Sequence, residues 1–318
     1  MSIILDAAVL KIHESAIDFV PEADRAQFEK YILKRWKHSP NTAKSVSSCV
    51  KHFYDFVEHA IAELTFDDID EYIEHLDTCE FKRSSKMAYI TSIHKYVQTV
   101  TYELNRRGAR IVELFPPEIE FMLDDVENIE GDEGLIPDEI MDKILATARA
   151  RSQREYVFFL LLKMCGMRVS ECRSIKKKNI HLEDRYLVTG VVHGCRKSNK
   201  NGDKPSVYFF TQAVANQIRQ YFTLLKLNEE WLFPGFHGNE FMAYPKYLFI
   251  DYSKIVGFDF NAHAFRRTII TKRFKMDCPI NVSHLLANHA IEDIEFQHYI
   301  KLSIAERRAL YDLWNPYK

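Results

Sequence analysis

The chain has 318 residues, of which 47% are hydrophobic and 28% charged, a balance typical of folded globular proteins that excludes extensive disorder. Its net charge of −2 hides an asymmetry, because Lys and Arg number 15 against 17 Asp and Glu in residues 1–110, none against 9 in 111–135, and 28 against 19 in 136–318. We therefore expect two domains, residues 1–110 and 136–318, joined by an acidic linker at residues 111–135.

The composition also bears on compartment and on cofactors. No apolar run reaches the ~20 residues of a membrane-spanning helix, and the first residues lack the basic start of a signal peptide. We expect a soluble, cytoplasmic protein whose six cysteines, which form no CxxC pair, stay reduced. The thirteen histidines do not alternate with cysteines at zinc-finger spacing, so no metal ion and no cofactor are expected.

The first domain has helical periodicity from residue 22 to about residue 107. Val46, Val50 and Phe53 recur at three- and four-residue spacing, and residues 65–68 resemble a capping box without the usual glutamate. These signals predict a compact bundle of four or five helices. Two edges of the bundle are basic: Lys34, Arg35, Lys37, Lys44 and Lys51 on one, and Lys82, Arg83, Lys86 and Lys95 on the other. They are either solvated helix faces or phosphate contacts that position the bundle on a duplex.

The second domain begins with helices and then changes period. Residues 156–162 form an apolar run that predicts a buried helix, whereas residues 186–192 and 207–210 are β-branched and aromatic runs typical of strands. Between the strands, Lys200 precedes an Asn-Gly turn signal, which predicts a hairpin. Helices resume from about residue 211, and residues 303–314 look like a capped amphipathic helix. The domain is predicted to be α+β with a small antiparallel sheet.

Three short segments of the second domain carry functional chemistry. Residues 166–171 have the sequence GMRVSE, residues 263–268 have the sequence HAFRRT, and Tyr299 follows a second histidine, His289. Arginine guanidinium groups can hold both non-bridging oxygens of a phosphate, and a tyrosine can attack it and stay attached. Two arginines, one or two histidines and a tyrosine in this order suit metal-free attack on a phosphodiester.

On these segments the chain resembles the tyrosine recombinases, or phage integrase family, over roughly residues 20–305. GMRVSE is close to the first-arginine box of the family, HAFRRT fits its His-x-x-Arg box, and the sequence LLANH at residues 285–289 resembles its histidine region. The resemblance implies a mainly α fold, with an N-terminal helical core-binding (SAM-like) bundle plus an α+β catalytic domain. The layout is similar to that of the Xer-type members.

The resemblance also implies a function and residue roles. The protein would be a site-specific recombinase that cuts and rejoins DNA through a 3′-phosphotyrosyl intermediate, without metal or ATP. The implied catalytic residues are Arg168, Lys200, His263, Arg266, His289 and Tyr299, with Lys197 and Lys204 competing with Lys200 as the acid for the leaving 5′ oxygen. The implied DNA contacts are Lys34, Arg35, Lys37, Lys44, Lys51, Lys82, Arg83 and Lys86 on the two basic edges, together with Lys197 and Arg267. The expected partners are double-stranded DNA and further copies of the chain in a tetramer.

The chain departs from the family pattern in one region. Tyr299 lies ten residues after His289, one more than is usual, and the Leu-Gly-His of the family is Leu-Ala-Asn-His here. One inserted loop residue would account for both differences, and it leaves Asn288 as a lesser candidate for the position of the histidine. Tyr311 and Tyr317 are nearby alternatives to Tyr299.

Other interpretations remain open at this stage. Arg168 could simply pair with Glu171 three residues on, and the terminal helix could pack on its own domain or on a neighbouring protomer. Two alternative functions share the fold. One is a catalytically degenerate DNA-binding regulator, which the shifted spacing would favour, and the other is a type IB topoisomerase-like enzyme that rejoins the same strand.

Overall fold

The computed structural model describes residues 18–36, 40–109, 111–112, 114–115, 134–189, 205–235, 241–289 and 301–317. The chain divides into two compact units, Met1–Ile129 and Glu130–Lys318, and the division falls inside the acidic strip at residues 111–135. Among the helices in these ranges, none is both long and apolar enough to cross a lipid bilayer. The fold is mainly helical with one small antiparallel sheet, which confirms the predicted fold class.

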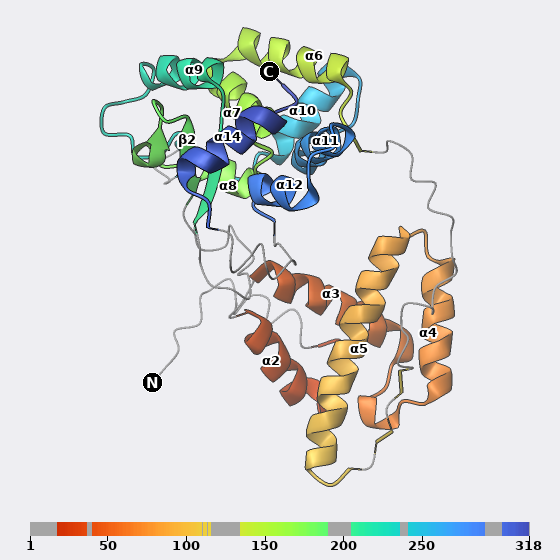
Figure 1. The fold of residues 1–318 in the computed structure, drawn as a ribbon. Coiled ribbons are helices and arrows are strands. Elements are labelled where there is room, and N and C mark those ends of the chain that lie inside the picture. The colour runs from red at the N-terminus through yellow and green to blue at the C-terminus, as the bar shows by residue number, and fades with distance from the viewer. Residues whose placement is uncertain are drawn as a thin grey trace. The chain divides into compact units, whose positions relative to one another are not determined.

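The N-terminal unit is a bundle of helices (Figure 1). In the described residues it comprises α2 (Glu22–Trp36), α3 (Pro40–Val57), the short 3-10 helix η1 (Ile61–Glu63), α4 (Phe66–Thr78) and α5 (Arg83–Arg106). Thr65 caps α4 in a capping box in which Asp68 takes the place of the usual glutamate. The apolar stripes meet in a core that buries Phe53, Ile93 and Tyr96 completely. The periodic sequence thus forms the helices that it predicts.

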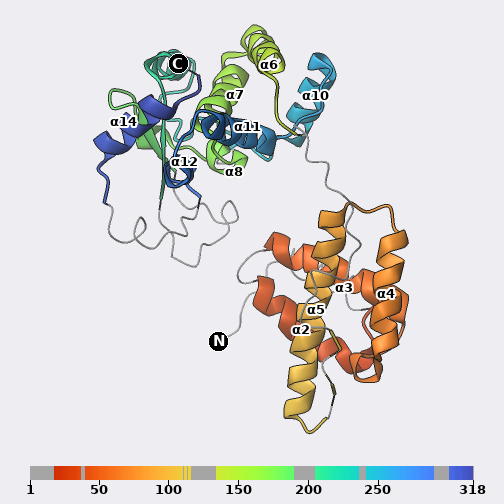
Figure 2. The same ribbon diagram turned by 45° about the vertical axis from the view of Figure 1, so that its right-hand side comes forward.

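The C-terminal unit is larger and is built around a buried helix, α7 (Gln153–Cys165). Around it lie α6 (Asp138–Arg151), α8 (Val169–Arg173), η3 (Lys177–Asn179), α9 (Gln212–Phe222), α10 (Lys246–Val256), α11 (Ala262–Lys275), α12 (Ile280–Ala287) and α14 (Ile304–Trp314). Figure 2 shows α7 between α6 and α11. Phe159 of α7 is fully buried and stacks on Phe265 of α11 with ring centroids 5.8 Å apart. The apolar run at residues 156–162 is therefore a core helix, as predicted.

The small sheet has the order β1-β2-β3 and is antiparallel throughout. Strand β2 (Tyr186–Thr189) lies in the first run predicted as a strand, and β3 (Ser206–Phe209) begins one residue before the second run, with Thr189 opposite Ser206 in the register. β1 (Ile180–His181) was not predicted, because two residues are too few to show an alternating pattern. The predicted Asn-Gly turn and Lys200 lie outside the described residues.

Helix α14 packs on its own unit. Tyr311 is 1% exposed and clusters with Phe209 of β3 and Leu286 of α12. The guanidinium of Arg185 donates to both carboxylate oxygens of Asp312, over 3.0 and 2.6 Å. Of the two arrangements open for the terminal helix, the structure has the one in which the helix folds back onto the domain that carries it.

Candidate active site

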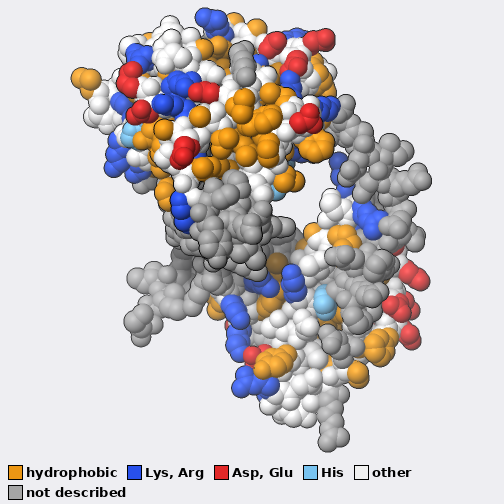
Figure 3. Space-filling view, in the orientation of Figure 1, with side chains coloured by type: hydrophobic (Ala, Val, Ile, Leu, Met, Phe, Trp, Pro, Cys, Tyr) orange, Lys and Arg blue, Asp and Glu red, His pale blue; other side chains and the backbone are white. Residues whose placement is uncertain are grey.

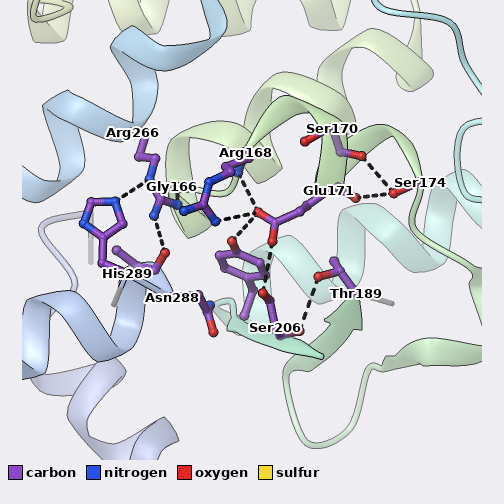
Figure 4. Close-up of polar contacts among 12 residues, drawn as sticks. Gly166, Arg168, Ser170, Glu171, Ser174, Thr189, Ser206, Arg266, Asn288 and His289 are labelled. Atoms are coloured by element: carbon purple, nitrogen blue, oxygen red, sulfur yellow. Dashed lines mark hydrogen bonds and ion pairs between the residues drawn. The ribbon is translucent and has the colours of Figure 1, made fainter. Parts of the chain in front are cut away.

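Five segments of the C-terminal unit converge on one polar cluster (Figure 4). They are the turn after α7, the start of α8, strand β3, helix α11 and the end of α12. The cluster brings together Arg168, Arg266 and His289, three of the residues that the family resemblance implies are catalytic. It lies largely below the surface, so each charge in it needs a partner within the protein.

The turn after α7 requires a glycine. Gly166 ends the helix in the left-handed conformation, with φ of 59°, and a Cβ at this position would lie 2.5 Å from Cγ2 of Ile269. The turn leaves the Gly166 carbonyl oxygen facing α11, where it accepts a hydrogen bond of 2.8 Å from Nη1 of Arg266. The glycine of the GMRVSE segment therefore helps to hold the second arginine.

Arg266 is 1% exposed and is held by hydrogen bonds along its whole guanidinium. Besides the bond to Gly166, Nη2 donates to the carbonyl oxygen of Ala287 over 2.5 Å, and Nε donates to Nε2 of His289 over 3.0 Å. Arginine has no acceptor, so Nε2 of His289 is the unprotonated nitrogen and the ring proton sits on Nδ1. The imidazole is therefore neutral and keeps one N–H to donate to a ligand.

Arg168 is held by a buried carboxylate. Glu171 is 3% exposed, and one of its oxygens lies 3.6 Å from Nη1 of Arg168 and accepts from the Arg168 backbone amide. Ser206 and Tyr208 of β3 donate to the same carboxylate over 3.0 and 2.7 Å. The pairing of Arg168 with Glu171 is thus present, and it orients an arginine whose side chain remains 39% exposed toward the same cluster as Arg266.

The electrostatics of the cluster keep both histidines neutral. Burial is the main cause that lowers the pKa of His289, to about 4, with Arg266 and Arg168 adding to the effect. Burial and then the charges of Arg267 and Arg266 lower the pKa of His263. The cluster therefore places two neutral imidazoles beside two guanidinium groups. The ring of His263 can accept a proton, whereas Nε2 of His289 already accepts the hydrogen bond from Arg266.

His263 sits in the first turn of α11 and is exposed. The side chain of Asn261 caps this helix by accepting hydrogen bonds from the backbone amides of His263 and Ala264. The cap determines where the first turn begins, and Arg266 follows one turn later on the same helix. The His-x-x-Arg spacing places an exposed histidine above a buried arginine.

Asn288 does not take the place of the histidine. It ends α12 in the left-handed conformation, with φ of 51°, and its side chain forms two hydrogen bonds with the backbone of Val207 in β3, over 3.3 and 2.8 Å. This conformation is the one that glycine adopts most readily, so Asn288 fits the position of the family's glycine directly before the histidine. No inserted residue is needed here, and the extra residue of spacing lies beyond His289, outside the described residues.

Several predicted residues lie outside the part of the chain that the structure describes. These are Tyr299, Lys37 and the three hairpin lysines Lys197, Lys200 and Lys204. The alternative tyrosines are described. The Tyr311 hydroxyl donates to the Met164 carbonyl oxygen, and the ammonium groups of Lys163 and Lys272 lie 4.7 and 4.9 Å from the centroid of the Tyr317 ring. Burial raises the pKa of both hydroxyls.

The basic residues of the N-terminal unit fall into three groups. Lys34 and Arg35 line a groove of about 390 Å³ between α2 and α5 together with Lys30 and Arg107, whereas Lys51 and Lys86 form ion pairs with acidic neighbours. Lys44 and Lys82 are exposed, and Arg83 is partly exposed. Figure 3 shows basic side chains over α2 and acidic ones over α4, so this unit has a basic side and an acidic side.

Arg267 is exposed, and its guanidinium lies against the backbone of Gly134, where a Cβ would come within 2.2 Å of it. The sequence interpretation missed Ser206 and Tyr208. Their signal was present, because two polar hydroxyl residues two positions apart in an apolar strand lie on one face. It became interpretable only once the structure showed that this face meets Glu171.

The chain is similar in sequence to known proteins. Residues 135–306 match the phage integrase family. The chain is 24% identical over 260 residues to a protein named tyrosine recombinase XerA from Saccharolobus solfataricus, covering 78% of each chain. It is 23% identical over 325 residues to tyrosine recombinase XerC from Rickettsia typhi, covering 92% of this chain and 96% of that protein.

Two solved structures share the fold. One is the Tn1549 transposon integrase in complex with a circular intermediate DNA, with a TM-score of 0.64 and 14% identity over 91% of this chain and 98% of that one. The other is the XerH site-specific recombinase bound to a palindromic difH substrate, with a TM-score of 0.64 and 13% identity over 98% of this chain and 86% of that one.

Proposed function

Since the chain belongs to the phage integrase family, the tyrosine recombinases, we propose that it cuts and rejoins DNA through a 3′-phosphotyrosyl intermediate, with no metal ion and no ATP. The observation that carries this proposal is the convergence of Arg168, Arg266, His263 and His289 in one partly buried cluster. Such a cluster supplies fixed positive charge and neutral proton carriers, which attack on a phosphodiester needs.

The two arginines have different tasks in this proposal. Arg168, with its partly exposed side chain, binds the non-bridging oxygens of the scissile phosphate directly. Arg266 has three N–H groups engaged by protein acceptors, so it is pre-organised and directs its remaining N–H groups and its charge at the same phosphate. His289 adds a neutral Nδ1–H donor. These fixed donors stabilise the charge that develops on the phosphate during attack.

The nucleophile in this proposal is Tyr299, which attacks phosphorus while the 5′ oxygen leaves. A tyrosine hydroxyl has a pKa of ~10, so it must lose its proton during attack. His263 accepts that proton, and its lowered pKa, which keeps the ring neutral, supports this role. The burial of Tyr311 and Tyr317 supports Tyr299 as the attacking residue. The Tyr311 hydroxyl is buried and donates to the Met164 carbonyl oxygen, and the Tyr317 hydroxyl is buried without a hydrogen-bond partner among the described residues, so neither oxygen is exposed to a phosphate.

The leaving 5′ oxygen takes its proton from a lysine of the predicted hairpin, and we propose Lys200, with Lys197 and Lys204 as its competitors. The support is that β3, one arm of the hairpin, carries Ser206 and Tyr208 against Glu171. The strand that leads out of the hairpin therefore contacts the cluster directly, through Glu171. In the second half of the reaction the 5′ hydroxyl of the partner strand attacks the phosphotyrosine, and the proton transfers run in reverse.

The proposed partners are double-stranded DNA and three further copies of the chain. The N-terminal unit would meet the DNA backbone with its basic side, through Lys34, Arg35 and Lys44, and not with the acidic α4. The solved integrase and XerH structures are described as DNA complexes, which supports this assignment. Exchange between two duplexes breaks four strands, and one tyrosine per chain then calls for a tetramer.

The test is covalent trapping. The wild-type chain and Tyr299→Phe are incubated in EDTA with DNA from either side of the gene, denatured with SDS and examined for protein–DNA adducts. We expect an adduct with the wild type and none with Tyr299→Phe. An adduct that survives Tyr299→Phe would place the nucleophile elsewhere, and binding without any adduct would favour the regulator interpretation. Strand exchange between two marked duplexes separates a recombinase from an enzyme that rejoins the same strand.

A further inference from the structure

A second cluster of reactive side chains lies in the N-terminal unit, between α3 and α4. His52 of α3, His75 of α4 and Cys79 each offer one ligand atom, and the three atoms lie within 4.8 Å of one another. Nε2 of His75 lies 3.8 Å from Sγ of Cys79, and the rings of His52 and His75 stack with centroids 5.6 Å apart. None of the roles proposed above uses these residues.

The helices explain why these side chains meet. His75 is in the last turn of α4 and Cys79 is its C-cap, four residues on, so the two side chains lie on one face. The Cys79 backbone amide donates to the His75 carbonyl oxygen, which fixes this geometry. His52 comes from the helix that packs beside α4 (Figure 2). All three residues are partly exposed, so a metal ion can reach them from solvent.

We propose that His52, His75 and Cys79 bind a zinc ion, with a water molecule as the fourth ligand. Zinc takes tetrahedral sets of nitrogen and sulfur ligands, with bonds of roughly 2.3 Å to sulfur and 2.0 Å to nitrogen. At the tetrahedral angle, those bonds place a sulfur and a nitrogen ligand about 3.5 Å apart. The observed 3.8 Å between Cys79 and His75 is close to this value. Because the three ligand atoms lie within 4.8 Å of one another, closing the cluster around the ion needs movements of at most about 1.5 Å.

The surroundings of the cluster fit a metal site. The Tyr72 hydroxyl lies 3.1 Å from Nδ1 of His52, which orients this ring and leaves Nε2 for the ion. Phe56 stacks on His75 with centroids 4.8 Å apart, and so limits the rotation of the second ring. Tyr72 is 1% exposed, so its hydroxyl is fixed by the core of the bundle. Two of the three ligands are thus held in place before any metal binds.

The ligand types select the class of ion. A thiolate with two imidazoles favours zinc and other borderline or soft ions over magnesium or calcium, which prefer oxygen ligands. The ion would link α3 to the end of α4 and so stabilise the N-terminal unit. The expectation of no metal ion rested on zinc-finger spacing along the sequence. This cluster instead forms because α3 packs on α4, which brings His52 close to His75, 23 residues later in the chain.

The experiment uses the untagged full-length chain, stripped of metal by a chelator and titrated with Co²⁺ as a spectroscopic probe. We expect one ion per chain, a thiolate-to-cobalt charge-transfer band and the strong visible bands of tetrahedral cobalt, all abolished by added Zn²⁺. Cys79→Ser should lose the charge-transfer band, and His52→Gln should lose the tetrahedral spectrum. Cys278→Ser, which alters a buried thiol of the other unit, should retain both. Tyr72→Phe should weaken zinc binding about 10- to 100-fold.

A charge-transfer band that persists in Cys79→Ser would overturn the proposal, as would a weak octahedral spectrum shared by all variants. Zinc should also raise the unfolding temperature of the wild type, and not that of Cys79→Ser, because an ion that binds only the folded state stabilises it. An equal shift in both proteins would likewise overturn it. The experiment contains no DNA, so its outcome is independent of the recombinase chemistry.

Discussion

Each unit of the molecule contains a buried carboxylate that accepts a hydrogen bond from a tyrosine, Asp24 in the N-terminal unit and Glu171 in the C-terminal unit, and the two have different roles. In the N-terminal unit Asp24 is 1% exposed, and one of its oxygens accepts from the Tyr54 hydroxyl over 2.8 Å and from the Ile61 amide over 2.7 Å. In the C-terminal unit Glu171 is 3% exposed and accepts from Tyr208 and Ser206, but it also faces Arg168. Both carboxylates accept from a tyrosine hydroxyl, but Glu171 also has the guanidinium of Arg168 beside it.

This difference shows in the electrostatics of each carboxyl. Burial is the main cause that raises the pKa of Asp24, so the bundle makes its charged form less favourable and uses the group to tie α2 to α3 and η1. Glu171 lies beside a cation whose side chain reaches the candidate site. A buried carboxylate is therefore no sign of function by itself. Its charged neighbours indicate whether it holds helices together or orients a site.

Replacing each carboxyl by its amide should separate the two roles, with the largest effect on catalysis. Glu171→Gln keeps the size of the side chain but removes the charge that orients Arg168, so we expect the rate of adduct formation to fall about 10²-fold. Asp24→Asn keeps an oxygen for both hydrogen bonds, so the rate should not change and the free energy of unfolding should change by less than about 1 kcal/mol. Single-turnover trapping and denaturant unfolding measure the two quantities.

DNA affinity distinguishes orientation from general damage at Glu171. If the substitution only misplaces Arg168, the variant should bind DNA as the wild type does and still form the adduct slowly. Equal losses of rate in Glu171→Gln and Asp24→Asn, or a rate unaffected by Glu171→Gln, would contradict the distinction between the two carboxyls.

Acid should weaken the C-terminal unit through His289. The pKa of this histidine is about 4 when folded and ~6.5 when unfolded, so its contribution to stability is present above pH 6.5 and is lost as the pH falls toward 4. Allowing for solvent screening, we expect a loss of about 2 kcal/mol. Asp24 has the opposite sign, because a raised folded pKa makes acid relieve its buried charge. Hydrogen exchange followed by mass spectrometry resolves the two units.

The matched variant is His289→Gln, which offers an oxygen to Nε of Arg266 but does not titrate. It should lose most of the acid sensitivity of the C-terminal unit between pH 6.5 and 4, while His284→Gln on the same helix should keep it. A steeper acid loss in the N-terminal unit than in the C-terminal unit would contradict the assigned signs.

Local sequence patterns predicted the helices and strands, whereas the contacts between distant residues depend on how these elements pack. The helical stripes, the capping box at Thr65 and the two strand runs all depend on neighbours within a few residues, so they can be recognised in the sequence. The contact between Arg266 and His289 could be expected only from a family resemblance, because it joins residues 23 positions apart. The roles of Ser206 and Tyr208 required knowing which face of β3 meets α8.

The smallest predicted effect compares how one helix ends in each unit. Helix α3 is followed by Glu58, with φ of 58°, and α12 by Asn288, with φ of 51°, so both ends use a left-handed residue that is not glycine. Glycine removes the strain of this conformation, which is about 1 kcal/mol. Glu58→Gly should therefore raise the free energy of unfolding slightly. Asn288→Gly should lower it by about 1 kcal/mol, because it also loses two hydrogen bonds to Val207.

Denaturant unfolding of both variants tests this comparison, and Asn288→Ala, which loses the hydrogen bonds and retains the strain, should be the least stable of the three. If Asn288→Gly were as stable as Glu58→Gly, the amide of Asn288 would contribute nothing to joining α12 to β3. The position of His289, one residue later, would then depend on Arg266 alone. If Asn288→Gly is less stable than Glu58→Gly, the hydrogen bonds of Asn288 to β3 contribute to stability. The sheet then helps, together with Arg266, to position His289.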